Sequence, residues 1–220
     1  MSVVALETSV RPASVAVRTA HAAADRVLAP ERAHASDLLP CIDELLASIA
    51  SNPRDIDTVI VGTGPGSYTG LRVGIATALG LARGADAKMF GVPSCDALAY
   101  GALAPGERGV LLLDARQQQL YFAQFERTED DVVLIDVPQI TDAESLQALL
   151  PDAIPIFGDK TAPEAAQLDA ETALRMRPAE PRAVDLLELG MHRLEKHGPM
   201  RPADIEPLYL RPFQAKKRKR

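Results

Sequence analysis

Tryptophan is absent from this sequence, and aromatic residues make up only 4% of it. The core must therefore be built mostly from Ala, Val, Ile and Leu, which favours closely packed helices and strands. Hydrophobic residues make up 47% and charged residues 25%, as is usual for a globular protein. The composition predicts a folded chain of one large domain or two small lobes.

Cysteine and histidine are also scarce. Cys41 and Cys95 lie far apart and form no CxxC pair, which favours a reduced protein without disulfides. None of the four histidines falls in an HxxxH or HExxH pattern, and the sequence contains no GxSxG elbow. Neither cysteine lies in a Cys–His pattern suited to nucleophilic catalysis. We therefore predict no catalytic residues, no metal ligands and no cofactor.

The sequence has no apolar run long enough to cross a bilayer. Its first residues have no basic start, and Glu7 interrupts them, so they predict a strand and not a signal peptide. We therefore expect a cytoplasmic protein that does not contact a membrane.

Charge is distributed unevenly along the chain. The formal net charge is −6, and because Lys216–Arg220 are five consecutive cations, the rest of the chain carries −11. Such an acidic body should bind a polyanion poorly, since phosphate contacts need clustered Lys and Arg. The tail is therefore either a solvated end or a contact to RNA.

Hydrophobic patterning predicts a chain in which strands and helices alternate. Short apolar or alternating runs predict strands at 3–6, 13–17, 25–28, 58–61, 89–92, 110–114, 120–125, 132–137 and 154–157. Helices are expected at 37–50, 71–82, 94–100, 141–150 and 183–196, with N-caps at Ser36, Ser94 and Thr141. We predict an α/β fold with a lobe at 1–103, a second lobe at 104–215 and a basic tail at 216–220.

A glycine-rich loop at 62–70 joins a predicted strand to a predicted helix. Glycines allow positive φ and close backbone approach, and N–H groups at a helix start can bind an anion. The spacing matches neither a Walker A loop nor GxGxxG. The loop is therefore either a tight turn, with Ser67 or Thr69 capping the helix, or an anion site.

The helix after this loop has small residues at a spacing of four, at Gly70, Gly74 and Ala78. Glycine inside a helix costs about 1 kcal/mol relative to alanine, so close packing must compensate. That packing is either internal or against the helix of a partner.

Four segments resemble the bacterial TsaB family, also called YeaZ, of the complex that makes threonylcarbamoyladenosine in tRNA. They are residues 61–74 (VGTGPGSYTGLRVG), 34–46 (HASDLLPCIDELL), 113–116 (LDAR, followed by Tyr121) and 207–211 (PLYLR). The resemblance is strong through about residue 125 and weaker over 126–200. One departure is Glu7-Thr8-Ser9, where the family usually has Asp-Thr-Ser.

The resemblance implies two ribonuclease-H-like lobes of the actin-like ATPase superfamily, with mixed sheets flanked by helices. It implies a non-catalytic subunit that pairs with a TsaD-like catalytic paralogue and a TsaE-like ATPase. The complex would transfer threonylcarbamoyl to adenosine 37 of ANN-decoding tRNAs, so that this chain meets tRNA indirectly. Alone, it would form a homodimer.

The resemblance also places the subunit contact on the helices predicted at 37–50 and 71–82. The expected interface residues are His34, Leu38, Ile42, Leu45, Gly70, Arg72, Gly74 and Ala78. An anion or nucleotide contact is expected at Glu7, Gly64, Gly66 and Ser67, because in actin-like ATPases the acidic residue at this turn helps to position Mg²⁺ and phosphates. The longer Glu7 side chain weighs against that chemistry, and a carboxylate that caps a turn is the other interpretation.

Two other functions remain open at this point. The chain is alternatively an actin-like small-molecule kinase or a peptidase active on its own, although neither a second phosphate loop nor a peptidase nucleophile is evident. It is otherwise an interaction module or homodimer with no link to tRNA.

Overall fold

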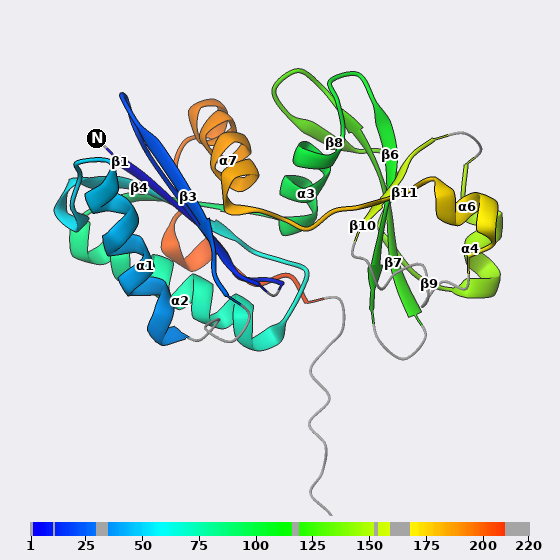
Figure 1. Ribbon diagram of the computed structural model, residues 1–220, viewed down its shortest axis with the longest axis horizontal. Helices are drawn as coiled ribbons and strands as arrows, with labels where there is room; N and C mark the ends of the chain where they lie inside the picture. Colours follow the sequence, from blue (N-terminus) through cyan, green and yellow to red (C-terminus); the bar gives the residue numbers. More distant parts are fainter. Residues whose placement is uncertain are drawn as a thin grey trace, which may run out of the picture.

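The computed structural model describes residues 2–10, 12–29, 35–115, 119–151, 154–158 and 168–209. Two mixed sheets lie side by side, each with helices on its faces (Figure 1). This arrangement confirms the predicted α/β class. The predictions for His34 and Lys216–Arg220 lie outside the described residues.

The first sheet has the strand order β3-β2-β1-β4-β5. Its strands are β1 (Ser2–Glu7), β2 (Ser14–Thr19), β3 (Ala23–Val27), β4 (Ile56–Gly62) and β5 (Lys88–Val92). The first three form an antiparallel meander, and β4 and β5 continue from β1 in parallel. The carboxyl ends of β1 and β4 therefore meet at one edge, where the glycine-rich loop begins.

Three helices cover the two faces of this sheet (Figure 1). One face packs against α1 (Ala35–Ser48) and α2 (Tyr68–Ala85) through an aliphatic core. The other face packs against α7 (Ala183–His197), which approaches β4 closely because Gly190 has no side chain. A Cβ at Gly190 would lie 2.6 Å from Cγ2 of Ile60.

The second sheet has the order β11-β10-β6-β7-β8, and β9 also pairs with β7. Its strands are β6 (Arg108–Asp114), β7 (Gln119–Arg127), β8 (Val132–Leu134), β9 (Gln139–Asp142), β10 (Ile156–Gly158) and β11 (Met176–Pro178). Two short helices, α4 (Ala143–Leu149) and α6 (Ala170–Leu174), lie at its far side (Figure 1).

The two sheets share one core. Helices α3 (Ser94–Ala102) and α7 lie between the sheets, and their apolar side chains contact residues of both (Figure 1). The predicted second lobe therefore needs correction, because α7 belongs to 104–215 in sequence but covers the first sheet. A division into two sequence-continuous lobes does not describe this chain.

All three of these predicted N-caps and the extent of one strand also differ from prediction. Ser36 lies inside α1, and Ser94 lies inside α3, whose N-cap is Pro93. Thr141 belongs to β9, so that Asp142 caps α4. The strand expected at 132–137 ends at Leu134, because the following segment leaves the ladder before β9.

Candidate functional site: the glycine-rich loop and the outer helices

The glycine-rich loop leads from the end of β4 into the first turn of α2. Ser67 is the N-cap of α2, and its Oγ accepts a hydrogen bond from the N–H of Gly70 at 3.3 Å. This confirms Ser67 as a helix cap. Satisfying an otherwise unpaired N–H group at a helix start is the usual role of a serine in this position.

The glycines of the loop make room for the chain's own backbone. A Cβ at Gly64 would lie 2.9 Å from the carbonyl oxygen of Leu208, and a Cβ at Gly66 would lie 2.2 Å from that of Ser9. The loop is thus held between the β1–β2 turn and the segment 205–209. Internal packing accounts for both glycines.

Glu7 is fully buried beneath this loop. Its Oε1 accepts a hydrogen bond from the N–H of Ser9 at 2.6 Å, and its Oε2 has no hydrogen-bond partner among the described residues. Burial raises the pKa of Glu7, an effect that the neighbouring Ser9 and Ser94 only partly offset. A carboxyl with no exposed surface cannot reach a ligand, so the expected anion contact at Glu7 is wrong for this structure.

The segment 205–209, which we call the strap, closes the loop from the outside. Ile205 is buried, and the N–H of Leu208 donates to the carbonyl of Thr63 at 2.7 Å. The ring of Tyr209 stacks on Tyr68 with centroids 5.1 Å apart. The strap buries Gly64, which corrects the anion contact expected there. Gly66 and Ser67 stay exposed, and an anion contact at these two remains a prediction.

Most of the residues expected at a partner interface face the chain's own core. Leu38, Ile42, Leu45, Gly74 and Ala78 are buried. Gly70 is half-buried, and Arg72 is the one exposed residue among those of the set that the structure describes; its guanidinium lies 4.7 Å from the centre of the Tyr68 ring.

The row of small residues on α2 fits against the β1–β2 turn. A Cβ at Gly70 would lie 2.1 Å from the carbonyl oxygen of Thr8, and a Cβ at Gly74 would lie 2.1 Å from its Oγ1. The groove expected along Gly70, Gly74 and Ala78 is therefore internal, and its assignment to a partner is wrong.

A second row of small residues on α2 faces outward. Ala76, Gly80 and Gly84 follow the same spacing of four and are all exposed, and a Cβ at either glycine would meet nothing within 4 Å. They line a hollow of about 520 Å³ together with Leu39 of α1 and the 3-10 turn η2 (Pro53–Asp55). This surface, the α1–α2 groove, could receive another helix closely.

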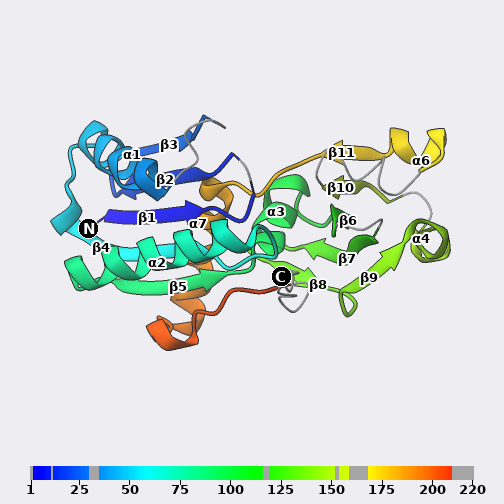
Figure 2. The ribbon, with the colours of Figure 1, turned by 90° about the horizontal axis from the view of Figure 1, so that it is seen from below.

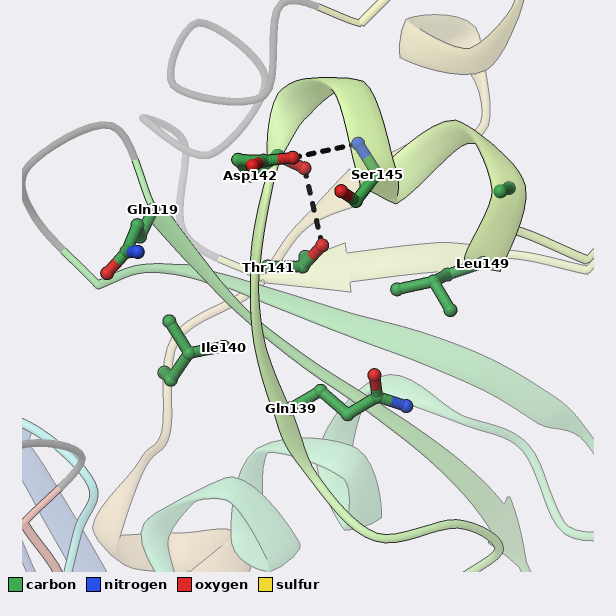
Figure 3. Close-up of a pocket in the computed structure, with 8 residues that line it drawn as sticks. Gln119, Gln139, Ile140, Thr141, Asp142, Ser145 and Leu149 are labelled. Atoms are coloured by element: carbon green, nitrogen blue, oxygen red, sulfur yellow. Dashed lines mark hydrogen bonds between the residues drawn. The ribbon is translucent and has the colours of Figure 1, made fainter.

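The second sheet carries a hollow of similar size, about 530 Å³, between β9 and α4 (Figure 3). The Asp142 carboxylate accepts a hydrogen bond from the N–H of Ser145 at 2.8 Å, and the Thr141 hydroxyl donates to the carbonyl of Asp142 at 3.4 Å. Asp142 is the only titratable residue among the described residues that line this hollow, so they supply no acid–base pair.

Neither a metal site nor a membrane-spanning helix is found among the described residues. In the ranges given above, no group of three or more His, Cys, Asp or Glu is placed to hold a metal ion. Within the same ranges, no helix is both long and apolar enough to span a membrane.

The sheet order 3-2-1-4-5, with an antiparallel meander followed by two parallel strands, defines a ribonuclease-H-like fold of the actin-like superfamily. Residues 24–173 match the family model described as "TsaD: tRNA N6-adenosine threonylcarbamoyltransferase". The solved structure of YeaZ from Pseudomonas aeruginosa aligns with a TM-score of 0.78 at 26% identity, covering 95% of this chain and 99% of that one.

Two curated relatives match the chain over nearly its whole length. The tRNA threonylcarbamoyladenosine biosynthesis protein TsaB of Escherichia coli is 30% identical, covering 96% of this chain and 95% of the relative. TsaB of Haemophilus influenzae is 32% identical, covering 96% and 94%. The chain belongs to the TsaB/YeaZ family, which is involved in tRNA threonylcarbamoyladenosine biosynthesis.

The sequence carries a signal for the α1–α2 groove, because Ala76, Gly80 and Gly84 follow the same small-residue spacing as Gly70, Gly74 and Ala78. The segment 207–209 resembles the family's ending, but nothing in it indicates that it covers the loop. Which small-residue row faces outward depends on the position of Thr8, 62 or more residues earlier in the chain.

Proposed function

We propose that this chain is a cytoplasmic, non-catalytic subunit required for threonylcarbamoyl transfer to adenosine 37 of ANN-decoding tRNAs. Its role is to bind and activate a TsaD-like catalytic paralogue, and a TsaE-like ATPase joins that pair. The observation that carries the proposal is the contrast between the two sides of α2. One side of this helix is filled by the chain itself, and the other presents an open α1–α2 groove.

The state of the glycine-rich loop supports a non-catalytic role. An enzyme of this fold would need the glycine-rich loop and the acidic residue at the end of β1, here Glu7, to face the phosphates of its substrate. Here the strap covers Gly64, and Glu7 has no exposed surface. The neutral form of Glu7 is favoured by burial, so this acid is suited to internal packing and not to holding a cation.

The α1–α2 groove supports a helical partner. Each glycine inside α2 costs about 1 kcal/mol relative to alanine, and neither Gly80 nor Gly84 recovers this by packing inside the chain. Close approach of another helix would compensate for the cost. A paralogue with the same fold carries an equivalent helix pair, so two such pairs would form a four-helix contact.

The same groove accounts for the other expected partners. Without the paralogue, two copies of this chain could pair through it as a C2 dimer, and that pairing would compete with the paralogue. The TsaE-like ATPase and tRNA would then bind the assembled pair. The acidic body of the chain fits an indirect contact with tRNA.

Gly80→Leu tests the groove, because the new side chain enters open space. We expect the variant to melt like the parent chain and to lose pairing with the TsaD-like subunit, measured by titration and by size exclusion with light scattering. Ala148→Leu is the matched control, an exposed small residue on α4 of the other sheet, and it should pair normally. A folded Gly80→Leu variant that pairs normally places the interface elsewhere.

The non-catalytic role is tested separately. We expect the isolated chain to turn over ATP negligibly in the presence of Mg²⁺. Robust turnover that Glu7→Ala abolishes would contradict the proposal and favour a kinase-like enzyme.

A further inference from the structure

Exposed apolar side chains gather on one margin of the second sheet. Eleven large hydrophobic residues are exposed among those the structure describes, and five of them fall within eight positions. These are Val133 (52%), Leu134 (42%), Ile135 (40%), Val137 (81%) and Ile140 (38%). We call residues 129–144 the acidic edge, because acidic side chains accompany this apolar group.

The acidic edge is the outer edge of the sheet. Strands β8 and β9 both pair with β7 on the side opposite β6, so that they form one margin and β11 forms the other (Figure 2). No other described strand pairs with the outer side of β8. An edge with exposed apolar side chains is a template for an added strand.

The backbone of β8 has groups directed outward. Ile135 donates its N–H to the carbonyl of Gln124 in β7 at 2.8 Å. Because successive residues of a strand direct their N–H and C=O groups to opposite sides, those of Leu134 point away from β7. Val133 lies opposite Glu126 and Leu134 lies opposite Phe125, so their side chains occupy the two faces of the sheet. An added strand would therefore meet an apolar side chain on each face.

The charge around this edge has one sign. Glu129, Asp130, Asp136, Asp142 and Glu144 are exposed. The sequence has no Lys, Arg or His from residue 128 to residue 159.

The neighbouring cations are already engaged. Arg193 of α7 binds Asp131 at 2.7 Å and Asp96 at 2.7 Å. Arg127 donates to the carbonyls of Thr128, Glu129 and Asp131. The surface that remains is apolar and acidic, which excludes a nucleic acid as its ligand.

We propose that the acidic edge binds an extended segment of a partner protein in which apolar, β-branched residues alternate with Lys or Arg. The segment adds a strand beside β8, so that its backbone pairs with Leu134 and its apolar side chains cover Val133 and Val137. Its cations lie against Asp130 and Asp136. A second copy of this chain does not fit, because two acidic edges would bring like charges together.

This inference does not rest on the proposed function. The acidic edge belongs to the second sheet, whereas the α1–α2 groove belongs to the outer helices of the first. Loss of one contact leaves the other intact, so failure of either proposal is visible separately.

The test uses the full chain and a fluorescent peptide in which valine and lysine alternate. The control is the same peptide with every lysine replaced by glutamate. Anisotropy should show saturable binding of the lysine peptide alone, weakened about tenfold between roughly 50 and 300 mM NaCl. Val137→Ser and Asp136→Asn should each weaken binding about fivefold. Leu134→Pro should abolish it, because proline removes the outward N–H while the Ile135 hydrogen bond to β7 stays.

Leu174→Ser is the matched control, since Leu174 is 87% exposed and ends α6 next to β11, at the margin of the sheet opposite β8. It should bind like the parent chain, and thermal melts should show that all four variants are folded. Equal binding of the two peptides, or unchanged binding by folded Leu134→Pro and Val137→Ser, overturns the proposal. Self-association of the parent chain that Leu134→Pro removes would assign the edge to a second copy instead.

Discussion

At the scale of single residues, two glycines of α2 should respond oppositely to the same added methyl group. Gly74→Ala places a Cβ 2.1 Å from Thr8 Oγ1 and should lower the free energy of unfolding by about 1 to 3 kcal/mol. The Cβ of Gly84→Ala enters open space, so the higher helix propensity of alanine should raise the free energy of unfolding by up to about 1 kcal/mol. Urea unfolding of the two variants measures both changes. A Gly74→Ala variant as stable as the parent chain would show that the contact between α2 and Thr8 can accommodate a methyl group.

Asp185 makes stability depend on pH. Burial raises the pKa of this carboxyl from 3.8 to about 6, and Asp25 and Glu188 add to the shift while Arg182 opposes it. The folded chain thus holds the proton more tightly than the unfolded chain. Stability should therefore decrease as pH rises from about 4 to 6, and stay lower above that window.

Asp185→Asn removes this titration. We expect little change in the melting temperature below pH 4 and, at pH 7.5, a gain in the free energy of unfolding of about 1 to 2 kcal/mol, reduced from the full shift by solvent screening. Melts across pH 3.5 to 8 measure it. A variant that is less stable than the parent chain at pH 7.5 would contradict the assignment.

Residue spacing predicted small-residue packing on α2 but not its direction. The rows 70/74/78 and 76/80/84 follow the same period and lie on different sides of the helix. Only the fold shows that the first row packs against Thr8 and that the second row faces solvent. Glu7 shows the same limit, because its carboxyl packs against Gly62 and Ser94, which lie far from it in sequence.

At the scale of elements, Arg193 connects α7 to α3 and to the β7–β8 turn. Its guanidinium is mostly buried and binds Asp96 and Asp131. Arg193→Met would leave two carboxylates close together without a cation, and should cost about 3 to 5 kcal/mol in urea unfolding. Arg193→Lys should cost less, because it keeps the positive charge. It should still cost something, because a lysine ammonium cannot bind both carboxylates as the arginine guanidinium does. A loss below about 1 kcal/mol with methionine would mean that water replaces the ion pairs.

Elements with a long regular pattern were predictable, and short ones only in part. The amphipathic spacing of α1, α2 and α7 and the apolar runs of β1, β4 and β6 are encoded locally. The short strands β8 and β10 were expected at 132–137 and 154–157. By contrast, β9, β11 and α6 were missed, because segments of three to five residues depend on neighbours distant in sequence. The strand β11, for example, is stabilised by pairing with β10.

At the scale of the whole molecule, the basic tail should matter only in the assembled complex. The rest of the chain carries −11, so deletion of Lys216–Arg220 should weaken tRNA binding by the complex and lower its salt dependence. Filter binding at several NaCl concentrations measures both, with an unchanged melting temperature as the control. Identical affinity and salt slope would show that the tail is only solvated.

The position of α7 has a consequence for synthesis of the protein. Val3, Ala5 and Ile60 of the first sheet share a core with Leu186 and Leu189, which a ribosome adds long after those strands have emerged. The nascent chain therefore carries an uncovered apolar sheet face until α7 has emerged. A product that stops before Ala183 keeps that face open, and chaperones and proteases recognise such surfaces. Closure of this core thus has to wait for the synthesis of α7.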